Sequence, residues 1–127
     1  MKTLLLVKAA AEVLAGLALG LFPSIVVPLL FGSPLDVSSG VVIARMAGAA
    51  LFTLGIACWL ARKDSQSRAA SGLLVALLVY DATVVAVLLY AHFGMGLYAI
   101  ALWPAIVLHS GLGIWTIVLR DSLRRRS

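Results

Sequence analysis

Three ionisable side chains, Glu12, Asp81 and His109, lie within stretches of sequence that are otherwise apolar. Charged groups are costly inside a lipid bilayer, and in membrane proteins they usually face the interior of a helix bundle or a water-filled cavity. Two carboxylates and an imidazole at one depth could share protons or bind a cation. These residue types therefore suggest a proton- or ion-coupled site.

The position of each residue along its apolar stretch indicates its depth. At about 1.5 Å per helical residue, Glu12 lies roughly 12 Å from the basic end of its stretch, Asp81 roughly 18 Å and His109 roughly 15 Å. We therefore predict that these three form a buried polar cluster near the membrane midplane. Arg45 lies roughly 24 Å from the basic end, so its long side chain could reach Asp81 or the lipid headgroups. Together with Tyr80, it would lie beside the cluster.

A structural role accounts for the same residues. Lys8 and Glu12 are one helical turn apart and could neutralise each other. Asp81 and Arg45 could form an interhelical ion pair that fixes the packing, and His109 could bond to a backbone carbonyl. At the level of sequence, both the functional and the structural interpretation stay open.

The composition points to a membrane protein. The chain is 63% hydrophobic and only 12% charged, whereas an average soluble domain is about 25% charged. A soluble protein of this size would have too few charges to cover its surface. The net charge of +5 comes from short basic clusters between apolar stretches, which indicates membrane topology and headgroup contact. We expect a lipid bilayer as the partner and no nucleic acid.

Four stretches are apolar and long enough to cross the bilayer as helices, at about residues 4–21, 40–61, 69–91 and 97–119. Between the first two, residues 23–31 are apolar but contain Pro23 and Pro28. Because proline suits the first turn of a helix, we predict a short interfacial helix there; the alternative is one long, kinked first helix. The predicted fold is all-α, a membrane-embedded four-helix bundle in a single domain of residues 1–127.

The basic residues predict the orientation. Nine of the ten lie before or early in the first span, in the loop 62–68 or after the last span. Cytoplasmic segments of membrane proteins carry an excess of lysine and arginine. We therefore predict a multi-pass protein of the bacterial inner membrane with both termini in the cytoplasm. Arg124, Arg125 and Arg126 are expected to meet anionic lipid headgroups.

Small residues recur at helical spacing in the first two spans, as in Gly16 with Gly20 and Ala44 with Gly48. Such residues let helix backbones approach closely in lipid. We favour packing within the bundle, although the same faces could form a homo-oligomer.

No motif names a reaction. The sequence lacks Gly-x-Ser-x-Gly, His-Glu-x-x-His, P-loop and dinucleotide-binding patterns. The single Cys58 excludes an internal disulfide and a cysteine-based metal motif. His92 lies roughly 34 Å from the basic end and His109 roughly 15 Å, which argues against one haem between them. We expect no catalytic residues, no cofactor and no metal ligands.

Features along much of the chain suggest a family. They are Gly16, Pro23 and Gly32 around the end of the first span, and Ala44-Arg45-Met46-Ala47-Gly48 through Leu54-Gly55 in the second. Their order resembles the small bacterial four-helix inner-membrane proteins of the DoxX-like type. That group has no single established activity, so the resemblance implies a fold and not a function.

Three functions fit the sequence. The first is a small transporter or channel-like protein that uses the midplane cluster. The second is a non-catalytic accessory subunit of a larger membrane complex, in which the buried charges lock the helices together. The third is a membrane protein that binds a lipid or a quinone.

Overall fold

Every regular element in residues 1–125, the part of the chain that the structure describes, is a helix. In order, this computed structural model contains α1 (Lys2–Leu21), α2 (Pro23–Phe31), α3 (Ser38–Ala61), the 3-10 turn η1 (Arg62–Asp64), α4 (Arg68–Phe93) and α5 (Leu102–Arg124). Helices α1, α3, α4 and α5 are long and apolar enough to cross a membrane. This confirms the predicted all-α class with four candidate spans and a short helix after the first.

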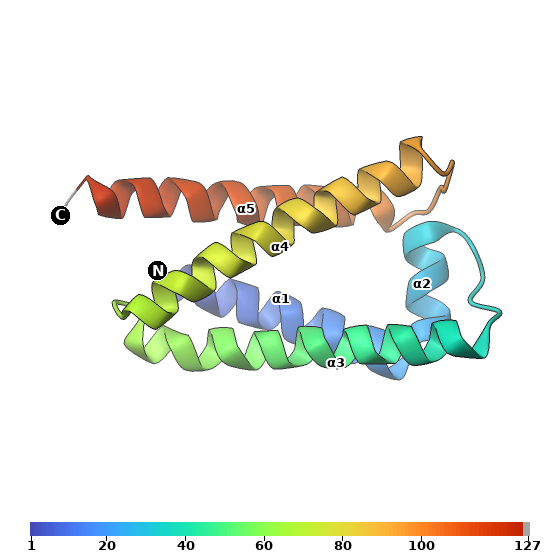
Figure 1. Cartoon of the computed structure of the whole chain (residues 1–127), viewed down its shortest axis with the longest axis horizontal. Coiled ribbons are helices and arrows are strands. Elements are labelled where there is room, and N and C mark those ends of the chain that lie inside the picture. Colours follow the sequence, from blue (N-terminus) through green and yellow to red (C-terminus); the bar gives the residue numbers. More distant parts are fainter. Residues whose placement is uncertain (126–127) are drawn as a thin grey trace.

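The long helices form two layers. Helix α1 packs along α3 in the most extensive interface of the molecule, and α4 packs along α5 in the second layer. Figure 1 shows α4 running obliquely, from the side of α1 and α3 at its start to α5 at its end, with both termini at the same end of the molecule. We call this the basic end, because it also holds the loop with Arg62, Lys63 and Arg68. Many leucine, isoleucine and valine side chains are exposed on the outside, as contact with lipid requires.

Glycines bring α1 and α3 together. A Cβ atom added at Gly16 would lie 2.5 Å from the backbone nitrogen of Phe52 and 2.7 Å from the carbonyl oxygen of Gly48. Gly48 and Gly55 face α1 with similar closeness. These contacts show that Gly16, Gly48 and Gly55 pack inside the bundle.

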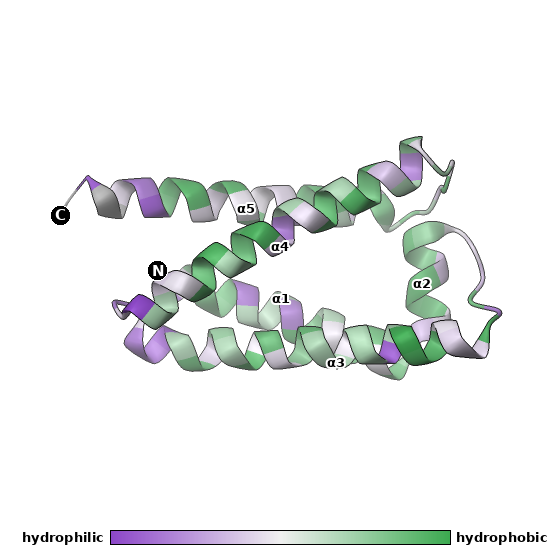
Figure 2. Ribbon diagram, viewed as in Figure 1, coloured by the Kyte–Doolittle hydropathy of each residue, from purple (hydrophilic) through white to green (hydrophobic). Residues whose placement is uncertain are grey.

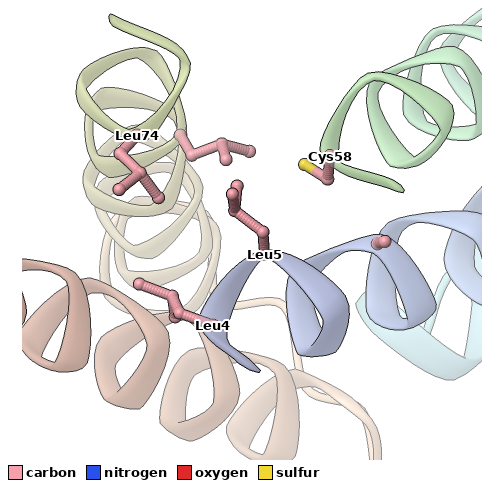
Figure 3. Close-up of a cluster of buried hydrophobic side chains, with 6 residues drawn as sticks. Leu4, Leu5, Cys58 and Leu74 are labelled. Atoms are coloured by element: carbon pink, nitrogen blue, oxygen red, sulfur yellow. The ribbon is translucent and has the colours of Figure 1, made fainter. Parts of the chain in front are cut away.

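The two layers are joined at the basic end by a cluster of buried apolar side chains. Leu4 and Leu5 of α1 meet Cys58 of α3 and Leu74 of α4 (Figure 3). A second cluster lies toward the opposite end and joins α4 and α5 to Phe31 of α2. The α4–α5 layer is therefore held to α1 and α3 at the basic end and to α2 at the opposite end.

Helix α2 lies across the long helices at the end opposite the termini (Figure 1). The α-helical path of α1 stops at Leu21, and Pro23 occupies the first turn of α2, where a missing N–H costs nothing. Gly32 ends α2 in the left-handed region, with φ of 70°. The carbonyl of Leu29 accepts a hydrogen bond from the Ala101 amide at 2.9 Å. The separate short helix is therefore confirmed, and the alternative of one long first helix is wrong.

The last span begins later than predicted, at Leu102 instead of residue 97. In the predicted helix, Pro104 would stand in the interior, where its ring clashes with the preceding turn and its missing N–H breaks a hydrogen bond. In the structure, Pro104 falls in the first turn of α5. Residues before it form the connection to α2 instead, through the Ala101 amide.

The α1–α3 interface leads to a test of packing in lipid. We expect Gly16→Ala to lower the free energy of unfolding by about 1–3 kcal/mol, because the added methyl group meets backbone atoms that cannot move away cheaply. Thermal denaturation of the purified protein in detergent would measure the change. Gly20→Ala is the matched control, because a Cβ atom at Gly20 has no neighbour within 4 Å. Equal effects of the two substitutions would contradict this account of the interface.

Candidate functional site

A buried carboxylate joins three helices in the middle of the bundle. Lys8 of α1 donates a hydrogen bond to Oδ2 of Asp81 on α4. Nδ1 of His109 on α5 lies 3.0 Å from Oδ1 of the same carboxylate. The side chains of Lys8 and Asp81 are 0% and 1% exposed. In Figure 2, hydrophilic bands interrupt the otherwise hydrophobic helices α1 and α4 in this region.

The hydrogen bond to Asp81 defines the tautomer of His109. A carboxylate can only accept, so Nδ1 of the imidazole must carry the hydrogen. In the neutral ring, Nε2 is then an acceptor and is free to bind another group. The Tyr80 ring meets the imidazole edge-on, with 5.6 Å between ring centroids. His109 is thus held on two sides by consecutive residues of α4.

Glu12 differs from the other ionisable residues of the site because its carboxyl group has no partner among the described residues. It lies one turn beyond Lys8 on α1, is 2% exposed, and forms no ion pair or hydrogen bond with another residue in the described part of the chain. Every fully enclosed side-chain nitrogen or oxygen in residues 1–125 does have a partner. The carboxyl oxygens of Glu12 therefore open onto the cavity that this residue lines.

That cavity, which we call the midplane cavity, has a volume of about 810 Å³ and is lined by residues of α1, α2, α3, α4 and α5. Most of its wall consists of alanine, valine and leucine side chains. Three lining residues have polar side chains: Glu12, Tyr80 and His109. An apolar pocket of several hundred Å³ with a few convergent polar groups is typical of sites for small molecules.

Arg45 lies apart from this group. It is exposed on α3 and does not line the midplane cavity. Both carboxylate oxygens of Asp81 are already engaged, one by Lys8 and one by His109. The Asp81–Arg45 pair that the sequence allowed is therefore not formed, and His109 bonds to a side chain instead of a backbone carbonyl.

Sequence reasoning missed the role of Lys8. Its position one helical turn before Glu12 suggested that these two residues neutralise each other. In the structure Lys8 is buried against Asp81, because α4 crosses α1 obliquely and brings the two residues together (Figure 1). One signal could have found it: a carboxylate in lipid requires a cation, and Lys8 and Arg45 were the two available within the spans.

The other histidine serves the connection between α4 and α5. Nδ1 of His92 lies 3.0 Å from the carbonyl oxygen of Leu97. Its ring packs edge-on against Phe93, Tyr98 and Trp103. Within the described residues, no three His, Cys, Asp or Glu side chains are grouped so that they could hold a metal ion.

The buried ion pair can be tested with a double-mutant cycle. We expect Lys8→Met alone to lower the free energy of unfolding by about 3 kcal/mol, because it leaves the Asp81 carboxylate buried without its cation. Adding Asp81→Asn to Lys8→Met should restore part of this loss, since no unpaired charge then remains. Thermal denaturation of the single and double variants in detergent would give the coupling energy.

The exposed ion pair between Asp121 and Arg125, with 2.8 Å between carboxylate and guanidinium, provides the control. Asp121→Asn should change stability little, because solvent screens exposed pairs. Additive losses in the Lys8 and Asp81 variants would contradict a coupled pair.

Comparison of the chain with protein families, with curated proteins and with solved structures finds no match. The resemblance to DoxX-like proteins therefore stays a prediction that rests on the residues given above. What the geometry establishes is a polytopic membrane protein with four candidate spans and a buried Lys8–Asp81 pair.

Proposed function

We propose that this protein binds a lipophilic molecule in the midplane cavity, inside the bacterial inner membrane. One observation supports this most strongly: the Glu12 carboxyl group is buried, unpaired among the described residues, and open to a cavity with largely apolar walls. A carboxyl group in apolar surroundings requires a proton, a cation or a hydrogen-bond donor. A ligand with a polar head and an apolar body would supply the partner and fill the cavity.

The arrangement of the polar groups restricts the head of the ligand. Glu12 accepts a hydrogen bond or pairs with a cation, and Nε2 of His109 accepts a hydrogen bond when the ring is uncharged. The Tyr80 hydroxyl can donate or accept. A head that donates hydrogen bonds or carries a positive charge fits these groups better than an anionic head. Lipids and reduced quinones with hydroxyl groups belong to the class of molecules that this site suits.

The packing of the layers favours access from the membrane. Contacts between the α1–α3 layer and the α4–α5 layer are few compared with those inside each layer. Separating the layers near the midplane cavity would mainly expose alanine, valine and leucine side chains, which lipid tails solvate well. A lipophilic ligand can thus reach the cavity without crossing water.

The basic residues support an orientation with the basic end in the cytoplasm. Of the three C-terminal arginines expected at the lipid headgroups, Arg126 lies outside the described residues, and Arg125 is exposed and paired with Asp121. Contact of this segment with anionic lipid belongs to the same proposal.

Binding can be measured with amphiphiles that share one tail and differ in the head. In nanodiscs, we expect dodecylamine to bind more tightly than dodecanol, and dodecanoate most weakly, because Glu12 favours a cation or a donor. Isothermal titration, corrected for partition into empty nanodiscs, gives the affinities. Glu12→Gln should reduce the preference for the amine by roughly tenfold, equivalent to about 1.4 kcal/mol.

A bulky residue in the cavity wall provides a second arm of this experiment. Ala47→Phe should weaken all three probes, because Ala47 lines the midplane cavity. Ala49→Phe is the matched control, since Ala49 is an exposed neighbour on α3 that does not line it. Unchanged binding in Ala47→Phe would rule out the midplane cavity as the ligand site. It would favour an accessory role in which the buried charges only fix the packing.

Proton- or ion-coupled transport is a second candidate, and the Lys8–Asp81–His109 chain of contacts favours it. The charges of Lys8 and Asp81 cancel, so a single proton or cation at Glu12 or His109 changes the net charge of the site. Coupled carriers use buried groups of this kind.

The transport candidate predicts a loss of flux. In proteoliposomes with an imposed pH gradient, proton flux should fall to the level of empty vesicles in Glu12→Gln and in Asp81→Asn. Asp121→Asn, on the exposed part of α5, should leave the flux unchanged. Wild-type flux in both midplane variants would eliminate this candidate without affecting the binding proposal.

A further inference from the structure

A second cavity lies at the basic end, where the start of α1 meets η1. We call it the basic pocket: it has a volume of about 330 Å³ and is lined by Lys2, Thr3, Leu6, Arg62 and Lys63. Three of these five side chains are positively charged and none is negatively charged. The basic pocket shares no lining residue with the midplane cavity.

One of the three cations is held in place. The guanidinium carbon of Arg62 lies 3.5 Å from the centroid of the Trp59 ring, and the arginine is half-buried. A cation over an aromatic face is attracted by the ring, and a planar guanidinium fixed in this way loses less conformational entropy when it binds an anion. Lys2 and Lys63 are exposed and free to close around a ligand.

The pocket also has donors and an apolar edge. The first helical hydrogen bond of α1 runs from the Leu5 amide to the Met1 carbonyl, so the amides before Leu5 have no partner within the helix. Two of these amides belong to Lys2 and Thr3, which line the pocket. Leu6 and Trp59 are exposed apolar groups on the adjoining surface, where tryptophan is typical of the membrane interface.

Three cations, free donors and an adjacent apolar surface match a phosphate group attached to acyl chains. We propose that the basic pocket binds the phosphate of an anionic phospholipid, whose chains lie along Leu6 and Trp59. Arg62 forks onto the phosphate oxygens, and Lys2 and Lys63 neutralise the remaining charge. Asp64 follows Lys63 in η1 but is exposed and does not line the pocket. The site is independent of the ligand proposed for the midplane cavity.

General attraction between a basic surface and anionic lipid is the competing explanation, and matched variants separate the two. Lys2→Gln/Lys63→Gln removes two charges from the pocket and keeps the Arg62–Trp59 contact. Arg68→Gln/Arg120→Gln removes two charges from the same end but outside the pocket. Because Lys2 and Lys63 each pair with the phosphate in the proposed site, the pocket variant should bind the lipid at least roughly tenfold more weakly, whereas the outside variant should bind it about as well as the wild type.

Native mass spectrometry of the full chain, titrated with phosphatidylglycerol or with phosphatidylcholine of identical chains, would measure the binding. We expect one tightly retained phosphatidylglycerol in the wild type and in the outside variant, and its loss in the pocket variant. Inorganic phosphate should compete poorly, because it lacks the acyl chains. Equal losses in both variants, no preference for phosphatidylglycerol, or inorganic phosphate binding as tightly as the lipid would each overturn the proposal.

Discussion

The ion pair between Lys8 and Asp81 is the constraint on which the rest of the structure depends. Either charge alone would be costly in lipid, and each makes the other tolerable. Because Lys8 belongs to one layer and Asp81 to the other, their pairing also fixes how the layers meet. His109 is positioned by the second oxygen of the same carboxylate, so the geometry of the whole polar site follows from one contact.

The pair also explains why Glu12 stands out. Once Lys8 is committed to Asp81, the lysine one turn away no longer neutralises Glu12 through a direct contact. The glutamate is left at the wall of the midplane cavity, where the apolar side chains around it offer no hydrogen-bond donor. The pairing of Lys8 with Asp81 thus has two consequences: it holds the two layers together, and it leaves the Glu12 carboxyl group without a partner. Only Glu12 then requires a ligand or a proton.

Much of the fold could be predicted from the sequence because lipid imposes simple rules. Hydropathy and length located the four spans, and Pro23 separated α2 from α1. Hydropathy alone predicts a start of α5 that is too early, because it does not take account of the local signal of Pro104. A proline can end a helix or begin one. The hydrogen bond from the Ala101 amide to Leu29 of α2, which holds the residues before Pro104 outside the helix, is a tertiary contact that local sequence does not reveal.

The site was harder to predict because the position of a residue along its helix gives only its depth in the bundle. It does not give the direction of the side chain or the neighbouring helix that it meets. It brought Asp81 and His109 to one level, and the structure places them in contact. It could not show that Arg45 points away from the cavity or that the oblique path of α4 brings Asp81 to Lys8. Helical rise assumes parallel axes, whereas the crossing of two helices is set by the side chains between them.

The helices are packed more closely in some parts of the molecule than in others, and this difference determines where the two layers can separate at the lowest cost. Between α1 and α3, backbone meets backbone at glycines, so these two helices are closely packed against each other. From the basic end to the middle of the bundle, separating the layers would break up the leucine cluster and expose the Lys8–Asp81 charges to lipid. Toward α2, separation breaks the second apolar cluster and releases the hydrogen bond from Ala101 to Leu29, but it exposes apolar side chains and not the Lys8–Asp81 charges. The layers can therefore part most cheaply beside α2, on the side of the ion pair where Glu12 faces the midplane cavity.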